Sequence, residues 1–373
     1  MQVEDVLAAY VEDYFETLSG ISYTDLERRQ HGFHSSLAFG AAGVAYACWH
    51  TALVLDEADL LDEAERWLGA TRGREKDRLS FLVPLSKRQE RPASHFLYGE
   101  AGLVFVRALV AHARQDAVAR GTALALFAEL SRASLADSPE LYNGAAGCLA
   151  GAAILSAYTR DARLLDLSAE LAADLVGRAV PDGGGMFHWP ELQGLGLSHG
   201  SAGPHLALLL QSIAAGSPLP HWFAPSVESL LRQAVTVPSR LCPSESHHAM
   251  LCNGFTGLVF LGARAHRALG GAGILEATRQ AASLAFAATS DLPDLCCGRA
   301  GAAFTSLALS QADPGGPWKN TATDLALSTL LCEREEWSKA GLFGGEAAVP
   351  CLAASLIAGC AGGPPSLDLL ELP

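Results

Sequence analysis

The residues best suited to chemistry are cysteines and a histidine that stand in three similar turns. These turns share the frame Gly-x-x-Gly and occupy residues 198–203, 251–257 and 295–301. His199 directly precedes the first glycine of one turn, Cys252 stands in the second turn, and Cys296 and Cys297 are adjacent in the third. Thiolates and imidazoles are the ligands that zinc prefers. The three turns therefore predict a zinc site, provided that the fold brings them together.

The same frame recurs along most of the chain. Four further copies follow Phe39, Tyr98, Asn143 and Phe343, the last with an alanine in place of its second glycine. The first glycines of the seven copies are 44 to 59 residues apart, which leaves room for one helix out and one helix back in each repeat. The chain therefore predicts seven repeats of two helices.

Hydrophobic patterning distinguishes the two helices of a repeat. The segments that follow the glycine pairs are apolar almost all round, as in 44–47, 103–106, 206–210 and 258–261. Such segments are typical of helices buried on every side. Residues 56–68 and 162–171 instead carry charges between apolar residues at helical spacing. This alternation fits a closed ring better than an open solenoid, whose concave face would be polar. We therefore predict an all-α fold, an α/α toroid of seven inner and seven outer helices.

Length and charge narrow the class of protein. The chain has 373 residues, of which 50% are hydrophobic, and its formal net charge is −14. This length would allow two domains, but no linker interrupts the repeat, so we expect a single domain over residues 1–373. The negative charge argues against nucleic acid as a ligand, because phosphate groups require a basic surface.

Neither a membrane span nor a secretory signal is expected. Residues 1–6 are acidic where a signal peptide would be basic, and the apolar run 347–359 is short and contains Pro350. The cysteines are odd in number and two of them are adjacent, which disfavours a disulfide framework. We expect a cytoplasmic protein with free or metal-bound thiols and no transmembrane segment.

Residues 72–92 differ from the rest of this acidic chain. They hold seven lysines and arginines against three acidic residues, and Pro84 and Pro92 prevent a continuous helix. We expect a long basic loop. It is either a solvated connection or a surface for an acidic partner, and the sequence leaves both interpretations open.

The repeat predicts how residues far apart in sequence come together. If each turn leads into an inner helix, the side chains before its first glycine emerge at one end of the ring. Cys252, Cys296 and Cys297 then form a three-thiolate cluster, which leaves the fourth zinc position open, as catalytic sites do. Five further cysteines are interpreted as small buried hydrophobes, namely Cys48, Cys148, Cys332, Cys351 and Cys360. His199 is either an acid/base residue or a hydrogen-bonded core histidine, and its register with the cysteines favours the first.

These motifs resemble those of the lanthionine synthetase C-like family, the lanthipeptide cyclases. Cys252-Asn253-Gly254 matches the first zinc-ligand motif of the family, and Cys296-Cys297-Gly298 matches the second, with Cys297 where many members have histidine. Residues 198–203 match its Ala-His-Gly motif. The resemblance covers the chain from about residue 37 to residue 357 by motif order. It implies a seven-repeat α/α barrel that binds Zn²⁺ through Cys252, Cys296 and Cys297.

The resemblance also implies a reaction. Members of the family add cysteine thiols of a peptide to dehydroalanine or dehydrobutyrine, which forms lanthionine or methyllanthionine thioether rings. The expected partners are a dehydrated precursor peptide and a separate dehydratase. The alternative is a non-catalytic zinc- and glutathione-binding adaptor of the same fold.

Three residues are implied as catalytic. His199 is suited to protonate the intermediate enolate, and Glu140, at a position where the family tends to carry aspartate, is suited to relay the thiol proton. These two roles are interchangeable at this stage. His248, four residues before Cys252 and beside His247, is either a further proton donor or an ordinary loop histidine.

Overall fold

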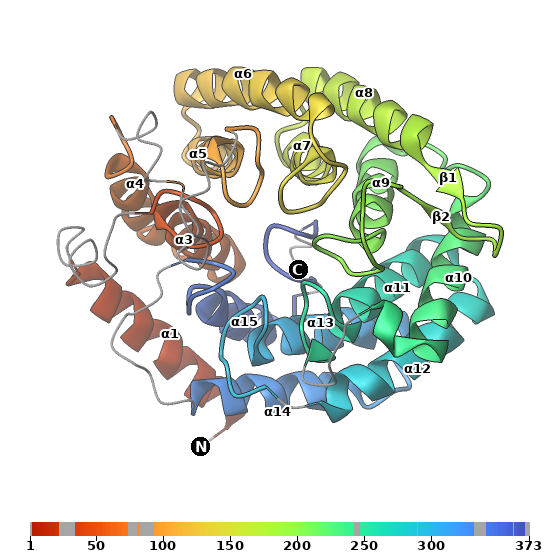
Figure 1. Cartoon of the computed structure of the whole chain (residues 1–373). Coiled ribbons are helices and arrows are strands. Elements are labelled where there is room, and N and C mark those ends of the chain that lie inside the picture. The colour runs from red at the N-terminus through yellow and green to blue at the C-terminus, as the bar shows by residue number, and fades with distance from the viewer. Residues whose placement is uncertain are drawn as a thin grey trace.

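The computed structural model describes residues 2–21, 34–73, 81, 93–241, 247–288, 290–331, 341–360 and 362–369. Its described helices form two concentric rings (Figure 1). Seven inner helices are α3 (Ala41–Leu55), α5 (Glu100–Ala113), α7 (Ala145–Thr159), α9 (Ala202–Ala215), α11 (Phe255–Leu269), α13 (Arg299–Ala312) and α15 (Ala348–Ile357). Seven outer helices are α1 (Val3–Ser19), α4 (Leu60–Gly69), α6 (Ala117–Ala133), α8 (Ala162–Arg178), α10 (Phe223–Thr236), α12 (Ala272–Ala287) and α14 (Trp318–Leu330). The predicted all-α toroid is confirmed.

The inner ring closes because its last helix packs against its first. Each inner helix contacts the next one along the chain, and α15 contacts α3. The outer partner of α15 is α1, which comes from the opposite end of the chain. The last repeat therefore obtains its outer helix from the N-terminal segment, an arrangement that the repeat pattern did not reveal.

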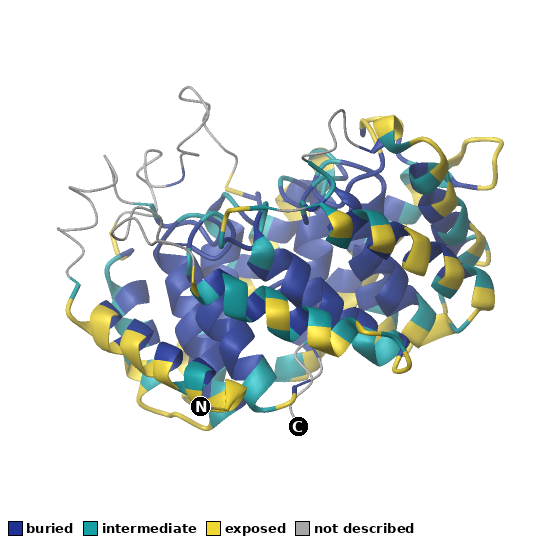
Figure 2. Ribbon diagram, turned by 90° about the horizontal axis from the view of Figure 1, so that it is seen from below, coloured by how far each residue is buried: buried dark blue, intermediate teal, exposed yellow. Residues whose placement is uncertain are grey.

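Side-chain composition explains which helices lie inside. In α7 every residue from Ala145 to Ser156 is buried, and most are alanine, glycine or leucine, which lets helices approach closely. In α8 the buried leucines recur every three or four residues, at Leu164, Leu167, Leu171 and Leu175, and the charged residues lie on the other face. Figure 2 shows the result, with buried helices surrounded by half-exposed ones.

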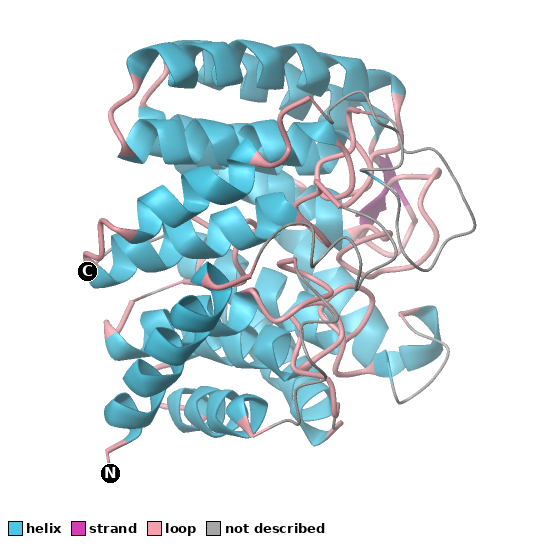
Figure 3. Cartoon of the chain, turned by 90° about the vertical axis from the view of Figure 1, so that its left-hand side faces the viewer, coloured by secondary structure: helices cyan, strands magenta, loops and turns pink. Residues whose placement is uncertain are grey.

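A ring of backbone hydrogen bonds joins the seven turns that lead into the inner helices. At each step the amide of one turn donates to the carbonyl of its neighbour, over 2.7 to 3.3 Å. The donor and acceptor pairs are Ala38 to Leu97, Leu97 to Tyr142, Leu141 to Ser198, Ser198 to Cys252, Leu251 to Cys296, Cys296 to Phe343 and Phe343 to Ala38. Because the seventh turn bonds back to the first, this set of hydrogen bonds is closed. All seven turns lie at one end of the ring, where most of the long loops gather (Figure 3).

The second glycine of the frame makes this close contact possible. A Cβ atom at Gly147 would lie 2.1 Å from the carbonyl oxygen of Leu141 and 2.8 Å from Cβ of Phe96 in the preceding turn. Both distances are far below van der Waals contact. The glycine is therefore required for space between turns, and its backbone is ordinary helix.

A segment near the C-terminus lies across the inside of the ring. The amide of Ser366 donates to the hydroxyl of Tyr46 on α3, and Asp368 forms an ion pair of 3.0 Å with Arg264 on α11. Both charged side chains are about 95% buried or more. Since α3 and α11 belong to the first and fifth repeats, residues 362–369 connect inner helices that are distant around the ring.

Three further observations bear on the predictions. A short antiparallel hairpin of β1 (Val180–Pro181) and β2 (Phe187–His188) lies between α8 and α9 and was not predicted. Of the expected basic loop 72–92, only residues 72, 73 and 81 are described, so that loop stays a prediction. None of the described helices combines the length and the apolar character needed to cross a membrane.

The spacing at the turns predicts the effect of a single methyl group. Gly147→Ala should lower the free energy of unfolding by about 2 kcal/mol, because the added Cβ has no room between two turns. Gly121→Ala is the matched control, since Gly121 lies in α6 and an added Cβ meets no atom within 4 Å. It should be neutral or stabilise the protein by up to about 1 kcal/mol. Urea denaturation of the two variants decides the matter, and equal stabilities would refute the packing argument.

Candidate functional site

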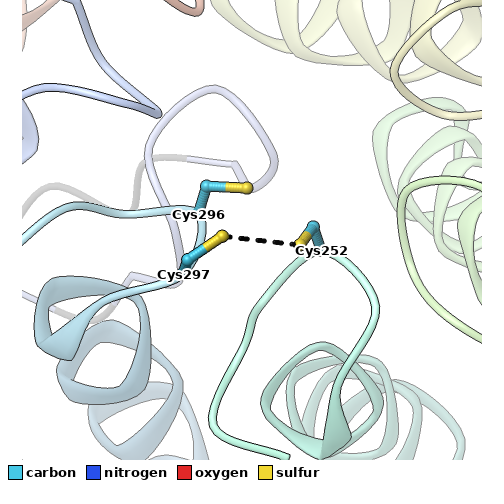
Figure 4. A group of neighbouring side chains, drawn as sticks. All are labelled: Cys252, Cys296 and Cys297. Carbon is cyan, nitrogen blue, oxygen red and sulfur yellow. Dashed lines mark hydrogen bonds between the residues drawn. The ribbon is translucent and has the colours of Figure 1, made fainter. Parts of the chain in front are cut away.

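Three thiols from two neighbouring turns meet at the end of the ring. Cys252 belongs to the turn before α11, and Cys296 and Cys297 belong to the turn before α13. The three sulfur atoms lie within 4.8 Å of one another, and Sγ of Cys252 is 3.9 Å from Sγ of Cys297 (Figure 4). The closed set of backbone hydrogen bonds among the turns explains this proximity, because the amides of Leu251 and Cys252 both donate to the carbonyl of Cys296. Within the described residues this is the one group of three or more potential ligands that could hold a metal ion.

The spacing of the sulfur atoms suits a tetrahedral metal ion. Zn–S bonds of about 2.3 Å at tetrahedral angles separate neighbouring sulfur atoms by about 3.8 Å, close to the 3.9 Å between Cys252 and Cys297. Cys252 is only 8% exposed, whereas Cys296 and Cys297 are half-buried. Three thiol ligands leave one position of a tetrahedral ion free, and the partial exposure of two of them gives a further ligand access.

The thiols influence one another's ionisation. Hydrogen bonds from Cys296, which has the larger influence, and from Cys297 hold the pKa of Cys252 well below its usual range, although burial opposes this effect. The same interaction with Cys252 raises the pKa of Cys296 well above its usual range and that of Cys297 to about 12. The cluster therefore loses one proton readily, and the negative charge then resists further ionisation. A bound dication removes that resistance, because it offsets the charge of the remaining thiolates.

His199 and Glu140 form a hydrogen-bonded pair in the two turns that precede the thiols. Nδ1 of His199 lies 3.0 Å from Oε2 of Glu140, which also accepts from Nδ2 of Asn143 over 3.1 Å. Burial is the largest influence on Glu140 and raises its pKa, but the hydrogen bond and charge of His199 and the bond from Asn143 together lower it. The carboxylate therefore orients the imidazole through Nδ1, and Nε2 is the ring nitrogen that this bond does not use.

The exposure of His199 separates it from a core histidine. Its side chain is 42% exposed, whereas His205, six residues further on, is fully buried. Both ring nitrogens of His205 have partners, namely the carbonyl of Ser201 and the hydroxyl of Ser226, and burial lowers its pKa to about 4. His205 therefore has the structural role that the sequence left open for His199.

The two histidines before Cys252 have different surroundings. The ring of His248 packs edge-on against Phe255 at 5.0 Å between centroids. The charge of His247 lowers the pKa of Cys297, which opposes the rise that Cys252 imposes on it. The structure thus places the ring of His248 against the start of inner helix α11, and His247 acts on Cys297 through its charge.

The four described cysteines outside the cluster are buried. Cys48, Cys148, Cys351 and Cys360 are each at most 2% exposed, and burial raises the pKa of Cys148 to about 11. They fit the interpretation as small hydrophobes. Cys332 lies outside the described residues.

Aromatic side chains complete the end of the ring and were not assigned a role from the sequence. Phe39 stacks on Tyr98 at 5.6 Å between centroids, and Tyr142 meets Phe343 edge-on at 5.4 Å. They come from the first, second, third and seventh turns, whereas His199 and the thiols come from the fourth, fifth and sixth. The signal was available, because each of these residues stands one or two positions before the first glycine of its turn.

The lowered pKa of Glu140 predicts a pH-dependent stability. A carboxylate with a depressed pKa stabilises the fold fully above its ordinary value of 4.5 and loses this effect as the pH falls through the lowered pKa. Glu140→Gln should therefore lower the free energy of unfolding by about 1 kcal/mol at neutral pH and by progressively less below about pH 4. Glu129→Gln, which replaces an exposed carboxylate on α6, is the control in denaturation at several pH values. The same pH profile in both variants would contradict the expectation.

Comparison with known proteins identifies the family. A model of the family described as lanthionine synthetase C-like protein matches residues 32–359. No curated protein is similar enough in sequence to match. Among solved structures, one named nisin cyclase is similar with a TM-score of 0.64 and 11% sequence identity, over 95% of this chain and 93% of that chain, which establishes a common fold. Because the family model covers most of the residues, the chain belongs to the lanthionine synthetase C-like family.

Proposed function

We propose that this protein is a zinc-dependent lanthipeptide cyclase, which adds cysteine thiols of a peptide to dehydroalanine or dehydrobutyrine to form thioether rings. The observation that carries the proposal is the cluster of Cys252, Cys296 and Cys297 at the same end of the ring as the pair of His199 and Glu140. Membership of the family and the fold shared with nisin cyclase support it.

Cys252, Cys296 and Cys297 are the proposed ligands of one Zn²⁺ ion. Zinc would supply a fourth coordination position at which a peptide thiol is held as the thiolate at neutral pH, where a free thiol is mostly protonated. Cys297 replaces the histidine of many relatives. Three thiolates carry one more negative charge than the dication neutralises, which favours an electron-rich and therefore nucleophilic sulfur at the fourth position.

The reaction is an addition that releases no product other than the ring. The sulfur of the peptide cysteine bonds to Cβ of the dehydroamino acid, and the electron pair of the carbon–carbon double bond moves to form an enolate. A proton then reaches Cα, so the proton lost by the thiol is balanced by the proton gained by carbon. The protein must hold a base for the first proton and an acid for the second.

His199 is the proposed acid. Its side chain is partly exposed, and its Nδ1 is engaged by Glu140, so Nε2 is the nitrogen that can reach a bound peptide. An ionised Glu140 stabilises the protonated imidazole and can receive the thiol proton through it. His248 is proposed as a further proton donor, with its ring packed edge-on against Phe255.

The substrate defines the expected partners. The reaction consumes dehydrated serine or threonine residues, so a dehydration reaction must supply them. We assign that reaction to a separate dehydratase that acts on the same precursor peptide.

Metal analysis tests the ligands. We expect one zinc ion per chain and its loss in Cys252→Ala and in Cys296→Ala, because two thiols hold the ion far more weakly than three. Cys360→Ala is the matched control, since this buried thiol lies in a separate small cluster with Val54 and Ala354. Unchanged zinc content in all three variants would overturn the ligand assignment.

The reaction itself is tested with a peptide that contains one dehydroalanine and one cysteine. Cyclisation leaves the mass unchanged but removes the thiol, so iodoacetamide labelling followed by mass spectrometry counts the rings. The protein should convert the peptide, Cys252→Ala should leave it at the uncatalysed rate, and His199→Asn should be slower by about 100-fold or more. Cys360→Ala should retain full activity.

If the peptide keeps its free thiol after incubation with the zinc-loaded protein, the cyclase proposal is refuted. Binding of glutathione to that same sample would then favour the non-catalytic adaptor. The two functions are distinguished because only the cyclase changes the alkylation state of the peptide.

A further inference from the structure

Tyr142 occupies the same position in its turn as two of the thiols. Tyr142, Cys252 and Cys296 each stand two residues before the first glycine of the frame. Their carbonyl groups have equivalent roles in the closed set of backbone hydrogen bonds, because they accept from the amides of Leu97, Ser198 and Leu251 respectively. Because equivalent backbone positions direct side chains alike, the phenol of Tyr142 emerges toward the part of the ring where the thiols lie.

The contacts of the Tyr142 ring confirm that it spans this end of the protein. It meets His199 of the fourth turn at 5.9 Å and Phe343 of the seventh turn at 5.4 Å between centroids. The fifth and sixth turns, which carry the thiols, lie between those two. The amide of Cys296 donates to the carbonyl of Phe343 over 3.0 Å. Phe343, whose ring Tyr142 contacts, is therefore hydrogen-bonded through its backbone to one of the three cysteines.

Among the described residues, the hydroxyl of Tyr142 has no hydrogen-bond partner. The side chain is 1% exposed, and its oxygen is out of reach of solvent. Buried hydroxyl groups are nearly always paired, because an unpaired one forfeits the bonds it made to water. An acceptor that forms when the protein reaches its working state would satisfy it, and thiolate sulfur is an acceptor that metal binding creates.

We propose that the Tyr142 hydroxyl donates a hydrogen bond to a thiolate sulfur of the metal-loaded cluster, that of Cys296 in the first place. Tyr142 is then a positioning residue that stabilises the excess negative charge of three thiolates on a dication. The inference rests on the metal-binding part of the proposed function and not on the reaction.

The electrostatics of the phenol agree with this role. Burial raises the pKa of Tyr142 well above its usual range, and the charges of Cys296 and Cys252 raise it further. The hydroxyl therefore keeps its proton and remains a donor beside ionised sulfur. Cys296 has the largest influence among the three thiols.

Tyr142→Phe removes the hydroxyl and keeps the ring. We expect zinc to bind about tenfold more weakly, as measured by competition with a chromophoric chelator, because hydrogen bonds to ligand atoms support metal affinity. With cobalt in place of zinc, the sulfur-to-metal charge-transfer band should move to lower energy, because the sulfur loses a donor. Tyr98→Phe is the matched control, since Tyr98 lies in the adjacent turn and packs against Tyr142 at 6.2 Å. It should leave both measurements unchanged.

Thermal unfolding separates this role from simple packing. The metal-free Tyr142→Phe protein should be at least as stable as the parent, because the variant loses a hydroxyl that has no partner. The stabilisation by added zinc should be smaller in the variant. Equal chelator competition and an unmoved cobalt band would overturn the proposal, as would an equal loss of stability with and without metal. These measurements need no peptide, so a protein that shows them without forming rings would refute the cyclase alone.

Discussion

The closed set of backbone hydrogen bonds among the seven turns is the constraint on which the rest of the structure depends. Each bond joins residues that are 44 or more positions apart in sequence, and the last bond returns to the first turn. The turns can approach this closely because a glycine stands at this contact in six of the seven turns, as at Gly147, and alanine stands there in the seventh. The inner helices begin directly after these turns. Their alignment into a ring therefore follows from contacts at one end, and apolar packing along their length stabilises it.

This constraint also produces the site. A residue that stands one or two positions before the glycine of any turn is held at the same height and directed into the same region. Cys252, Cys296 and Cys297 share one neighbourhood for this reason, and so do Tyr142 and His199. The site thus requires no special loop. Differences in residue type at these two repeated positions divide the site into a side with thiols and imidazole and an aromatic side.

Features with a repeating pattern could be predicted from the sequence, whereas features without one could not. The alternation of apolar and amphipathic segments indicated the inner and outer helices, and the register of the turns indicated that Cys252, Cys296 and Cys297 would meet. The role of α1 as the outer partner of α15 carries no local signal, because it depends on which surface remains uncovered when the ring closes. The packing of residues 362–369 across the ring, with Asp368 paired to Arg264, is equally non-local.

The sequence by itself determined the repeat, the class of fold and the set of residues available for chemistry, because periodic apolar patterns and repeated glycines act over short stretches of chain. Only the tertiary structure decided how those residues are used. It pairs His199 with Glu140, buries His205, packs His248 against Phe255 and leaves the buried hydroxyl of Tyr142 without a partner among the described residues. The physical reason is that hydrogen bonding, burial and ionisation depend on neighbours brought together by ring closure, and those neighbours are distant in sequence.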